Sequence, residues 1–259
     1  MNININRRIA VVTGAAKGIG RVIALQLAKE GVRLALWDKD KAGVYDLTAI
    51  INSTGGEAIY CKCDVSVETD VVTSLKDTLE HYGSVDILVA NAGIAIFSKV
   101  LEMDTQSWDD VFDVNSKGVF LCVKSIAPVM VKQKFGRIII ASSFGAIIPS
   151  VSSAAYAASK SALVSLTRVL AAELGMHNIT VNAYAPGMIP TDMSGIEKLT
   201  DERKDEMLDT LSIREWGQAE DIASLVIFLA SDQARYITGT LIDASGGKFS
   251  VQFAKQARL

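Results

Sequence analysis

The sequence predicts an α/β fold in which helices cover both faces of a parallel sheet. Apolar runs alternate with amphipathic stretches along the whole chain, which is typical of parallel strands joined by crossover helices. Several apolar runs are continuous in Val, Ile and Leu, as expected for strands buried on both faces. A glycine-rich turn follows the first run, which indicates a doubly wound Rossmann fold.

Seven apolar runs are the candidate strands of this parallel sheet. The 259-residue chain has no linker, low-complexity tract or block of like charge that marks a second domain, so we expect residues 1–259 to form a single domain. The predicted strands are Ile9–Thr13, Arg33–Trp37, Glu57–Cys63, Ile87–Ala90, Arg137–Ala141, Thr180–Ala183 and Gly239–Asp243.

The turn after the first strand predicts a dinucleotide site. It contains Gly14, Lys17, Gly18, Ile19 and Gly20 and opens a helical pattern. Glycines at a strand–helix junction let the backbone approach a pyrophosphate. The free N–H groups at the start of the helix attract the negative charge of that group.

Asp38, at the end of the second predicted strand, favours NAD over NADP. It lies 18 residues after Gly20, where a carboxylate accepts hydrogen bonds from the ribose hydroxyls and repels a 2′-phosphate. Lys17 and Lys39 argue for NADP, because basic groups there neutralise that phosphate. Since exposed charge pairs contribute little, we expect NAD, with NADP as the less favoured cofactor.

Two more groups of candidate cofactor residues stand at strand ends. Asp64 and Val65 end the third strand, and Asn91, Ala92 and Gly93 end the fourth. Ligands bind at the carboxyl ends of parallel strands. On spacing alone, ordinary turn chemistry explains the same residue types.

Tyr156, Lys160 and Ser143 are the candidate catalytic residues. Tyr156 and Lys160 are four residues apart, and Ser143 lies 13 residues before Tyr156. Side chains at i and i+4 share a helix face, so the ammonium is expected to lower the pKa of the phenol and make it a proton-transfer group near neutrality. The Ser143 hydroxyl is a candidate for orienting a substrate oxygen.

Residues 189–215 differ from the rest of the chain. This stretch is rich in charge and follows Pro186 and Gly187. It fits either a solvated surface helix or a substrate lid inserted on the ligand side of the sheet, and we favour the lid.

Composition excludes several classes of function. The net charge of −3 without a basic stripe argues against a nucleic-acid partner. No stretch approaches the roughly 18 apolar residues of a membrane span, and the N-terminus reads as a strand and not as a signal peptide, so we expect a cytoplasmic protein without a membrane partner. Three cysteines and two distant histidines predict neither a disulfide framework nor a metal site.

Together these motifs resemble the short-chain dehydrogenase/reductase family. The residues that carry the match are TGAAKGIG (13–20), CDVS (63–66), NAG (91–93), Asn115, Ser143, YAASK (156–160) and NAYAPG followed by MIPT (182–191), in that order. The match runs from about residue 7 to Gly247. Single motifs are weakly specific, whereas the whole series is highly specific.

The resemblance implies a role for each matching position. Tyr156 would be the general acid/base, Lys160 would lower its pKa and hold the nicotinamide ribose, Ser143 would bind the substrate oxygen, and Asn115 would anchor a relay water. The cofactor residues it implies are Gly14, Gly18, Ile19 and Gly20 at the pyrophosphate, Asp64 and Val65 at the adenine, Asn91 and Gly93 at the cofactor backbone, and Pro186, Ile189 and Thr191 at the carboxamide. Lys17, Ala92 and Gly187 are further candidate cofactor residues.

The implied reaction moves a hydride between NAD(H) and a small neutral secondary alcohol or ketone. The implied pocket residues are mostly apolar: Ile94, Ile96, Phe97, Ser143, Phe144, Ile147, Val151, Tyr184, Met188 and Met193. One alternative is an NADPH-dependent 3-oxoacyl-thioester reductase that meets an acidic acyl carrier protein. An alternative of another class is a nucleotide-sensing regulator without catalysis.

The helix around Tyr156 is rich in alanine, and small residues let helices of two subunits approach closely. Because members of the family are often tetramers, the resemblance predicts a homotetramer. Packing on the chain's own sheet explains the alanines equally.

Two positions depart from the family pattern, with Glu215 in place of an arginine and Ala219 in place of a proline. The chain also continues past Gly247. In this extension, 248–259, Phe249, Val251 and Phe253 alternate, which fits an added strand, a subunit clasp or a frayed tail.

Overall fold

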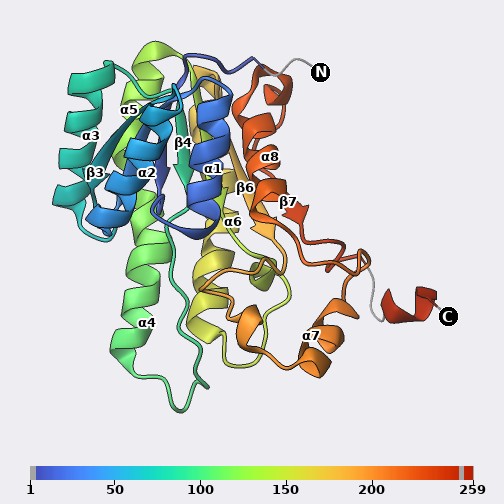
Figure 1. The fold of residues 1–259 in the computed structure, drawn as a ribbon. Helices are drawn as coiled ribbons and strands as arrows, with labels where there is room; N and C mark the ends of the chain where they lie inside the picture. Colours follow the sequence, from blue (N-terminus) through green and yellow to red (C-terminus); the bar gives the residue numbers. More distant parts are fainter. Residues whose placement is uncertain (1–3, 251–253, 259) are drawn as a thin grey trace.

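A seven-stranded parallel sheet in the order β3-β2-β1-β4-β5-β6-β7 forms the centre of the computed structural model, which describes residues 4–250 and 254–258. The α/β fold class predicted from the sequence is confirmed (Figure 1). The strands are β1 Ile9–Thr13, β2 Arg33–Asp38, β3 Glu57–Lys62, β4 Ile87–Ala90, β5 Gly136–Ala141, β6 Ile179–Pro186 and β7 Leu241–Ala244.

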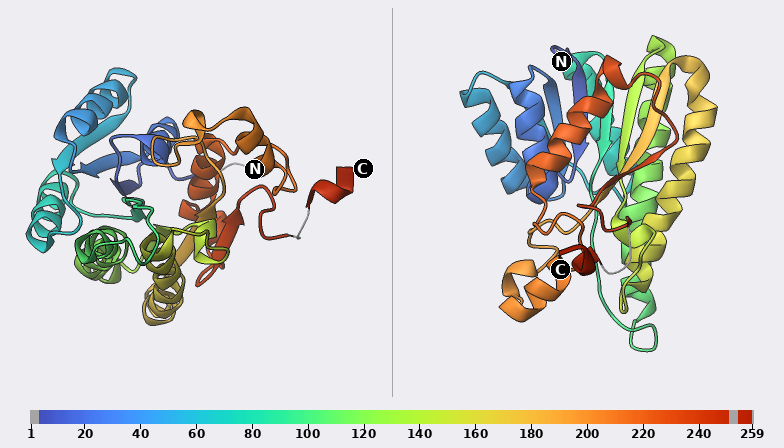
Figure 2. Two further views of the ribbon diagram at one scale, coloured as in Figure 1. Left: turned by 90° about the horizontal axis from the view of Figure 1, so that it is seen from below. Right: turned by 90° about the vertical axis from the view of Figure 1, so that its right-hand side faces the viewer.

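Helices cover both faces of this sheet. They are α1 Gly18–Lys29, α2 Lys41–Ser53, α3 Glu68–Tyr82, α4 Thr105–Phe112, α5 Gly118–Gln133, α6 Ala154–Leu174, α7 Asp201–Leu208 and α8 Ala219–Ala230. Buried side chains of α1, α2 and α8 pack on one face, and those of α3, α5 and α6 pack on the other. Figure 2 shows the sheet between these two layers.

The connection from β6 to β7 changes the face of the sheet. Strands β5, β6 and β7 follow one another in the same direction, yet α6 lies on one face and α8 on the other. The two crossovers therefore have opposite hands, although crossovers of parallel strands are nearly always right-handed. The chain consequently crosses the carboxyl edge of the sheet through residues 187–218, below the strands in Figure 1.

A continuous helical stretch joins α4 to α5 through a π-helical turn. This turn, η1, spans Asp113–Lys117. The whole stretch, Thr105–Gln133, is apolar and long enough to cross a membrane by composition, but half of its most apolar window is buried inside the protein. It therefore packs as a core helix.

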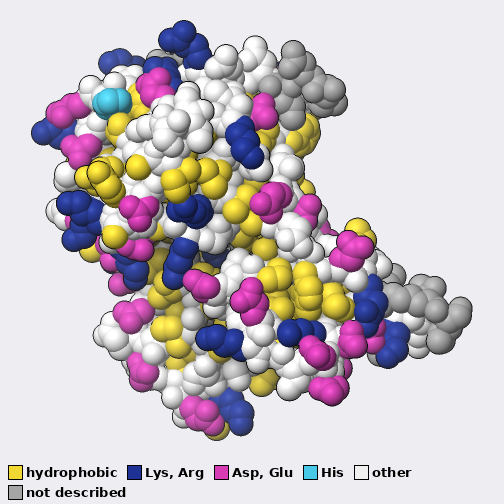
Figure 3. Space-filling model, viewed as in Figure 1, with side chains coloured by type: hydrophobic (Ala, Val, Ile, Leu, Met, Phe, Trp, Pro, Cys, Tyr) yellow, Lys and Arg dark blue, Asp and Glu magenta, His cyan; other side chains and the backbone are white. Residues whose placement is uncertain are grey.

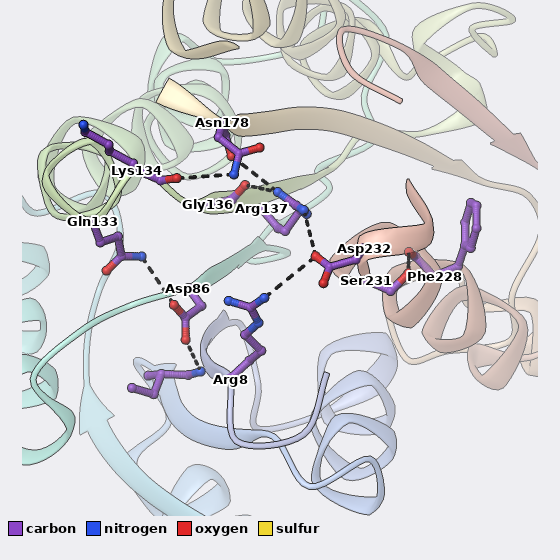
Figure 4. Close-up of polar contacts among 11 residues, drawn as sticks. Arg8, Asp86, Gln133, Lys134, Gly136, Arg137, Asn178, Phe228, Ser231 and Asp232 are labelled. Atoms are coloured by element: carbon purple, nitrogen blue, oxygen red, sulfur yellow. Dashed lines mark hydrogen bonds and ion pairs between the residues drawn. The ribbon is translucent and has the colours of Figure 1, made fainter. Parts of the chain in front are cut away.

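The amino edge of the sheet is joined by a network of charges (Figure 4). The Arg137 guanidinium is 2% exposed and lies 3.2 Å from an oxygen of Asp232, which is also 3.8 Å from Arg8. Both guanidinium groups stack on the Phe135 ring, 3.8 and 4.4 Å from its centroid. This edge lies opposite the carboxyl ends of the strands, where the sequence places the ligands.

Candidate active site

The predicted catalytic residues converge at the carboxyl edge of the sheet. Ser143 follows β5 and is 5% exposed, and Tyr156 lies in the first turn of α6. Both surround Gly145, where an added Cβ would lie 3.4 Å from Ser143 Oγ and 3.7 Å from a Tyr156 ring carbon. The Gly145 N–H donates to Ser143 Oγ at 3.0 Å, which fixes that side chain. The two hydroxyls thus face one small space, as a carbonyl-binding pair requires.

Lys160 lies near Tyr156 and is 4% exposed. Its Nζ donates to the Ala141 carbonyl at 2.7 Å and is 5.9 Å from the centroid of the Tyr156 ring. Burial disfavours the charged form and lowers the lysine pKa to about 8. The ammonium is therefore present at neutral pH and titrates just above it.

The pKa of Tyr156 differs in direction from the sequence-based expectation. Burial raises it above the ordinary phenol value, and the Ser143 hydroxyl only partly offsets this. The expected net lowering of this pKa is therefore not met in this structure, in which burial outweighs the Lys160 ammonium 5.9 Å from the ring centroid. The physical reason is that the Lys160 ammonium bonds to a backbone carbonyl while the phenol is desolvated.

Asn115 lies in the π-helical turn and joins three parts of the site. It is 0% exposed, accepts from the Ile94 N–H at 2.8 Å and donates to the Ile94 carbonyl at 2.9 Å and to Ser159 Oγ at 3.0 Å. An added Cβ at Gly93 would lie 3.3 Å from both Asn115 Oδ1 and Lys160 Nζ. Single π-helical turns occur frequently at functional sites, and this one brings Asn115 next to Lys160.

The glycine turn has the shape of a dinucleotide cradle. Gly14 has φ +65°, and a Cβ at Gly20 would lie 2.2 Å from the Gly14 carbonyl oxygen, so neither position accepts a side chain. Helix α1 starts here, and the side chain of its N-cap residue Lys17 makes no capping hydrogen bond. The N–H groups of its first turn therefore have no capping side chain as a partner, which suits a pyrophosphate.

Asp38 faces the glycine turn at the end of β2. One carboxylate oxygen accepts from the Ala16 N–H and the other from the Asp40 N–H, both at 2.9 Å. Lys17, one of the two lysines that argue for NADP, is exposed, and its Nζ lies 3.9 Å from Asp192. The carboxylate is therefore fixed by the backbone, whereas that cation is held only by an exposed pair.

The remaining predicted cofactor residues surround the same edge. Thr191 lies beside the glycine turn, because an added Cβ at Gly18 would be 4.0 Å from its methyl group. Asp64 accepts from the N–H and hydroxyl of Ser66 at 3.0 and 2.6 Å, and Val65 is 6% exposed. Ile189 is 5% exposed, and its side chain packs beside Gly217.

Comparison with known proteins supports one family over nearly the whole chain. A family model described as enoyl-(acyl carrier protein) reductase matches residues 14–248. The 3-oxoacyl-[acyl-carrier-protein] reductase of Staphylococcus epidermidis is 42% identical over 243 residues, which cover 93% of this chain and 98% of that protein. The chain belongs to the short-chain dehydrogenase/reductase family.

Other members of the family agree with this assignment. A short-chain dehydrogenase/reductase of Hericium erinaceus is 40% identical and covers 94% of the chain and 98% of its own length. Levodione reductase superposes with a TM-score of 0.90 at 32% identity, covering 94% of this chain and 98% of its own. A Sinorhizobium meliloti structure, described provisionally as a short-chain alcohol dehydrogenase, superposes with a TM-score of 0.91 at 34% identity. The match covers 95% of this chain and 98% of that one. The protein is therefore an oxidoreductase that acts on CH–OH groups with a nicotinamide nucleotide.

The residues expected to line the substrate pocket are mostly apolar, and four of them are exposed. Phe97, Ile147, Val151 and Met193 are between 48% and 87% exposed, and the Phe97 ring lies 6.0 Å from that of Tyr156. Ile94, Ile96, Phe144 and Met188 are partly buried. On the face seen in Figure 3, hydrophobic side chains gather between the main body and the lower segment that carries α7.

Tyr184 was expected in the pocket wall but lies in the core. It is 0% exposed, and its phenol donates to Asn91 Oδ1 at 3.2 Å. A core side chain without exposed surface does not line a substrate pocket, so this expectation is corrected.

The segment 189–215 packs through a few apolar anchors and carries α7. Ile196 is 4% exposed and Leu211 1% exposed, whereas most α7 side chains are charged. The C-terminal extension contacts the residues after this helix: Lys255 Nζ lies 2.8 Å from Asp209, and Lys248 Nζ donates to Thr210 Oγ1 at 2.6 Å. Residues 248–250 form a turn and Ala254–Arg258 a 3₁₀ turn, not a strand; Val251 and Phe253 lie outside the described residues.

The two departures from the family pattern have visible consequences. Glu215 is exposed, and among the described residues no ion pair involves it. Ala219 begins α8 without the proline, because Gln218 and Asp221 form a capping box in which the Gln218 N–H donates to Asp221 at 2.8 Å. The helix start is thus preserved by other means.

Sequence reasoning missed two polar residues of the site. Ser159 Oγ accepts from Asn115 and donates to the Tyr156 carbonyl at 2.7 Å, and Ser142 Oγ donates to the Lys160 carbonyl at 3.0 Å. Both are polar residues inside otherwise apolar runs, which is the signal that would have found them. Among the described residues no group of three His, Cys, Asp or Glu side chains could hold a metal ion.

Proposed function

We propose that the protein reduces the 3-carbonyl of a 3-oxoacyl thioester with hydride from a nicotinamide nucleotide. The observation that carries this proposal is the catalytic group, with Ser143 and Tyr156 beside Gly145 and Lys160 Nζ 5.9 Å from the Tyr156 ring centroid, in a chain 42% identical to a 3-oxoacyl-[acyl-carrier-protein] reductase. This substrate class was the alternative in the sequence analysis, and the curated relatives favour it over a simple alcohol.

Each residue of the catalytic group has its own role in the proposed reaction. A bound nicotinamide nucleotide supplies the hydride. The Ser143 hydroxyl donates to the carbonyl oxygen and orients it, and Tyr156 gives that oxygen its proton as negative charge develops. The Lys160 ammonium stabilises the phenolate that forms when Tyr156 gives up its proton. Asn115 holds the backbone of Ile94 and the α6 helix in place beside Tyr156.

The exposed apolar residues of the expected pocket suit an acyl substrate. Phe97, Ile147, Val151 and Met193 expose apolar surface beside the reacting group, and burying this surface against an acyl chain is favourable. We also propose that residues 189–215 act as the lid that closes on this chain, and that the exposed outer face of α5 and α6, including Phe120 and Val169, joins subunits of a homotetramer.

Asp38 supports NADH as the cofactor within this proposal. Its carboxylate is fixed by the Ala16 and Asp40 N–H groups where it meets the adenosine ribose and repels a 2′-phosphate. We expect Asp38→Ala to reduce the NADH over NADPH ratio of kcat/KM by about tenfold or more, the effect of losing a charged hydrogen-bond acceptor. An unchanged ratio would show that another residue reads the ribose.

An NAD-linked secondary alcohol dehydrogenase is the second candidate function. Asp38 favours it, and so does the surface expected to meet an acidic carrier protein. Three basic residues lie on or near this surface: Arg137 is 2% exposed and paired with Asp232, Lys132 shares a surface groove with Glu173, and Lys134 is exposed. This surface presents less free positive charge than carrier binding favours.

One pair of assays separates these candidates. Acetoacetyl-coenzyme A and a panel of small ketones are each reduced with NADH and with NADPH. The thioester reductase predicts that kcat/KM for acetoacetyl-coenzyme A exceeds that of every ketone by at least about 100-fold, which corresponds to the binding energy of the thioester portion. Equal or higher values for a simple ketone would transfer the assignment to the alcohol dehydrogenase.

A further inference from the structure

Tyr184 is a buried polar side chain for which the mechanism has no use. It lies near the carboxyl end of β6 and pairs with Ala141 of β5 and Ile242 of β7. Its phenol nevertheless reaches Asn91, which follows β4, and donates to Oδ1 at 3.2 Å. Because β5 stands between β4 and β6, the two side chains together span two strand spacings, roughly 10 Å.

The Asn91 amide is held at both ends. Nδ2 donates to the carbonyls of Thr13 and Gly14 at 3.1 and 3.3 Å, and Oδ1 accepts from the Tyr184 phenol. An amide has one accepting and one donating end. Reversal of the Asn91 amide would bring oxygen against two carbonyl oxygens, so this arrangement permits a single orientation.

The glycine turn rests directly on this amide. An added Cβ at Gly20 would lie 2.5 Å from Asn91 Nδ2 and 2.2 Å from the Gly14 carbonyl oxygen, and one at Gly14 would lie 2.8 Å from Ala92 Cα. Backbone and amide are therefore in close contact with no space between them. A displacement of the Asn91 side chain displaces the turn that faces the pyrophosphate.

We propose that Tyr184 is a positioning residue for the nicotinamide nucleotide, acting through Asn91 on the glycine turn. The inference rests on the proposed function only in placing the cofactor on that turn. Tyr184 is not a second acid/base, because it is 0% exposed and its proton is already donated to Asn91. Its phenol instead gives a buried amide oxygen the partner that it needs.

Tyr184→Phe tests this role by removing only the hydroxyl. The dissociation constants of NADH and of ADP-ribose are measured without substrate, by nicotinamide fluorescence and by calorimetry. We expect both ligands to bind about tenfold more weakly, the size of one lost hydrogen bond at a buried acceptor. Because ADP-ribose keeps the pyrophosphate and lacks the nicotinamide, equal losses locate the effect at the glycine turn. Unchanged binding, or a loss confined to NADH, overturns the proposal.

Tyr82→Phe is the matched control. The Tyr82 phenol donates a hydrogen bond of the same 3.2 Å length to the Leu34 carbonyl, on the side of the sheet covered by α3. Both variants lose one hydrogen bond, and we expect both to lower Tm. Only Tyr184→Phe is expected to weaken nucleotide binding; an equal weakening in both variants would reduce the role of Tyr184 to general stability.

A double-mutant cycle with Asn91→Ala tests the route through Asn91. In the Asn91→Ala background, Tyr184→Phe is expected to add no further loss of ADP-ribose affinity. A further tenfold loss would show that Tyr184 acts by another route and contradict the proposal. If the wild-type protein binds NADH or NADPH but does not reduce acetoacetyl-coenzyme A, the proposed function fails and the positioning role stands; if it binds neither nucleotide, both fail.

Discussion

At the scale of single residues, sequence spacing identified the catalytic group but not its ionisation. The four-residue interval brings Tyr156 and Lys160 onto one side of α6, and Ser143 arrives beside Gly145. The direction of each pKa shift depends on burial, which no spacing reveals: Lys160 is buried against the Ala141 carbonyl. Tyr184 was misplaced for the same reason, because an aromatic residue near a strand end fits a pocket wall and a core equally.

The buried lysine predicts the pH dependence of reduction. Its pKa is lowered by burial to about 8, so the ammonium is present below pH 8 and is lost above it, while the Tyr156 phenol, whose pKa is raised, stays protonated. We expect kcat/KM for carbonyl reduction to be constant at neutral pH and to fall above about pH 8, since kcat/KM reports the free enzyme. Lys160→Met is expected to lower the rate at every pH and to abolish that break. A wild-type profile that is flat to pH 9.5 would contradict this account.

At the scale of elements, the seven strands were predicted, and their ends differ for identifiable reasons. Strand β7 starts at Leu241 and not at Gly239, because Gly239 has φ +74°, which a strand does not accommodate. Strand β6 extends to Pro186, because β7 pairs with it as far as Ala244. Such pairing depends on segments about 60 residues apart and is invisible in local sequence.

The contact between the C-terminal extension and the segment 189–215 gives an element-scale prediction. Lys255 and Arg214 both pair with Asp209 and lower its carboxyl pKa to about 2, so the cluster stays charged at physiological pH. We expect Lys255→Ala to raise amide hydrogen exchange in α7 and the turn after it by about two- to fivefold, the effect of an exposed ion pair.

Lys76→Ala is the control for this exchange measurement. It removes the exposed 3.6 Å pair between Lys76 and Glu80 on α3, far from α7 in the fold. Its exchange rates in α7 are expected to equal those of the wild-type protein. If Lys255→Ala gives the same rates as well, the extension does not hold this segment.

At the scale of the whole molecule, the doubly wound layers followed from alternating patterns, whereas the change of face before β7 did not. Amphipathicity shows that a helix covers a sheet but does not show which face it covers. The two edges of the sheet differ in what they hold. The candidate active site lies at the carboxyl edge, which residues 187–218 cross, and the Arg137 network lies at the amino edge (Figure 4).

This amino-edge network predicts a stability effect without a functional one. Asp232→Asn leaves the buried Arg137 guanidinium without its carboxylate at 3.2 Å. We expect a loss of about 1–2 kcal/mol in the free energy of unfolding by urea, less than for a fully buried pair because Asp232 is largely exposed. Asp201→Asn, which breaks an exposed pair with Lys204, is expected to cost less than about 0.5 kcal/mol. Equal losses in the two variants would show that burial of Arg137 adds nothing.

The central claim is that Tyr156 transfers the proton, whereas the affinity for the nucleotide depends mainly on other residues of the carboxyl edge. Steady-state reduction of acetoacetyl-coenzyme A and NADH titration on Tyr156→Phe test it most directly. The account predicts that kcat falls by about 100-fold or more, as for the loss of a general acid, while the NADH dissociation constant changes by only a few-fold. Near-normal turnover in Tyr156→Phe would contradict the account.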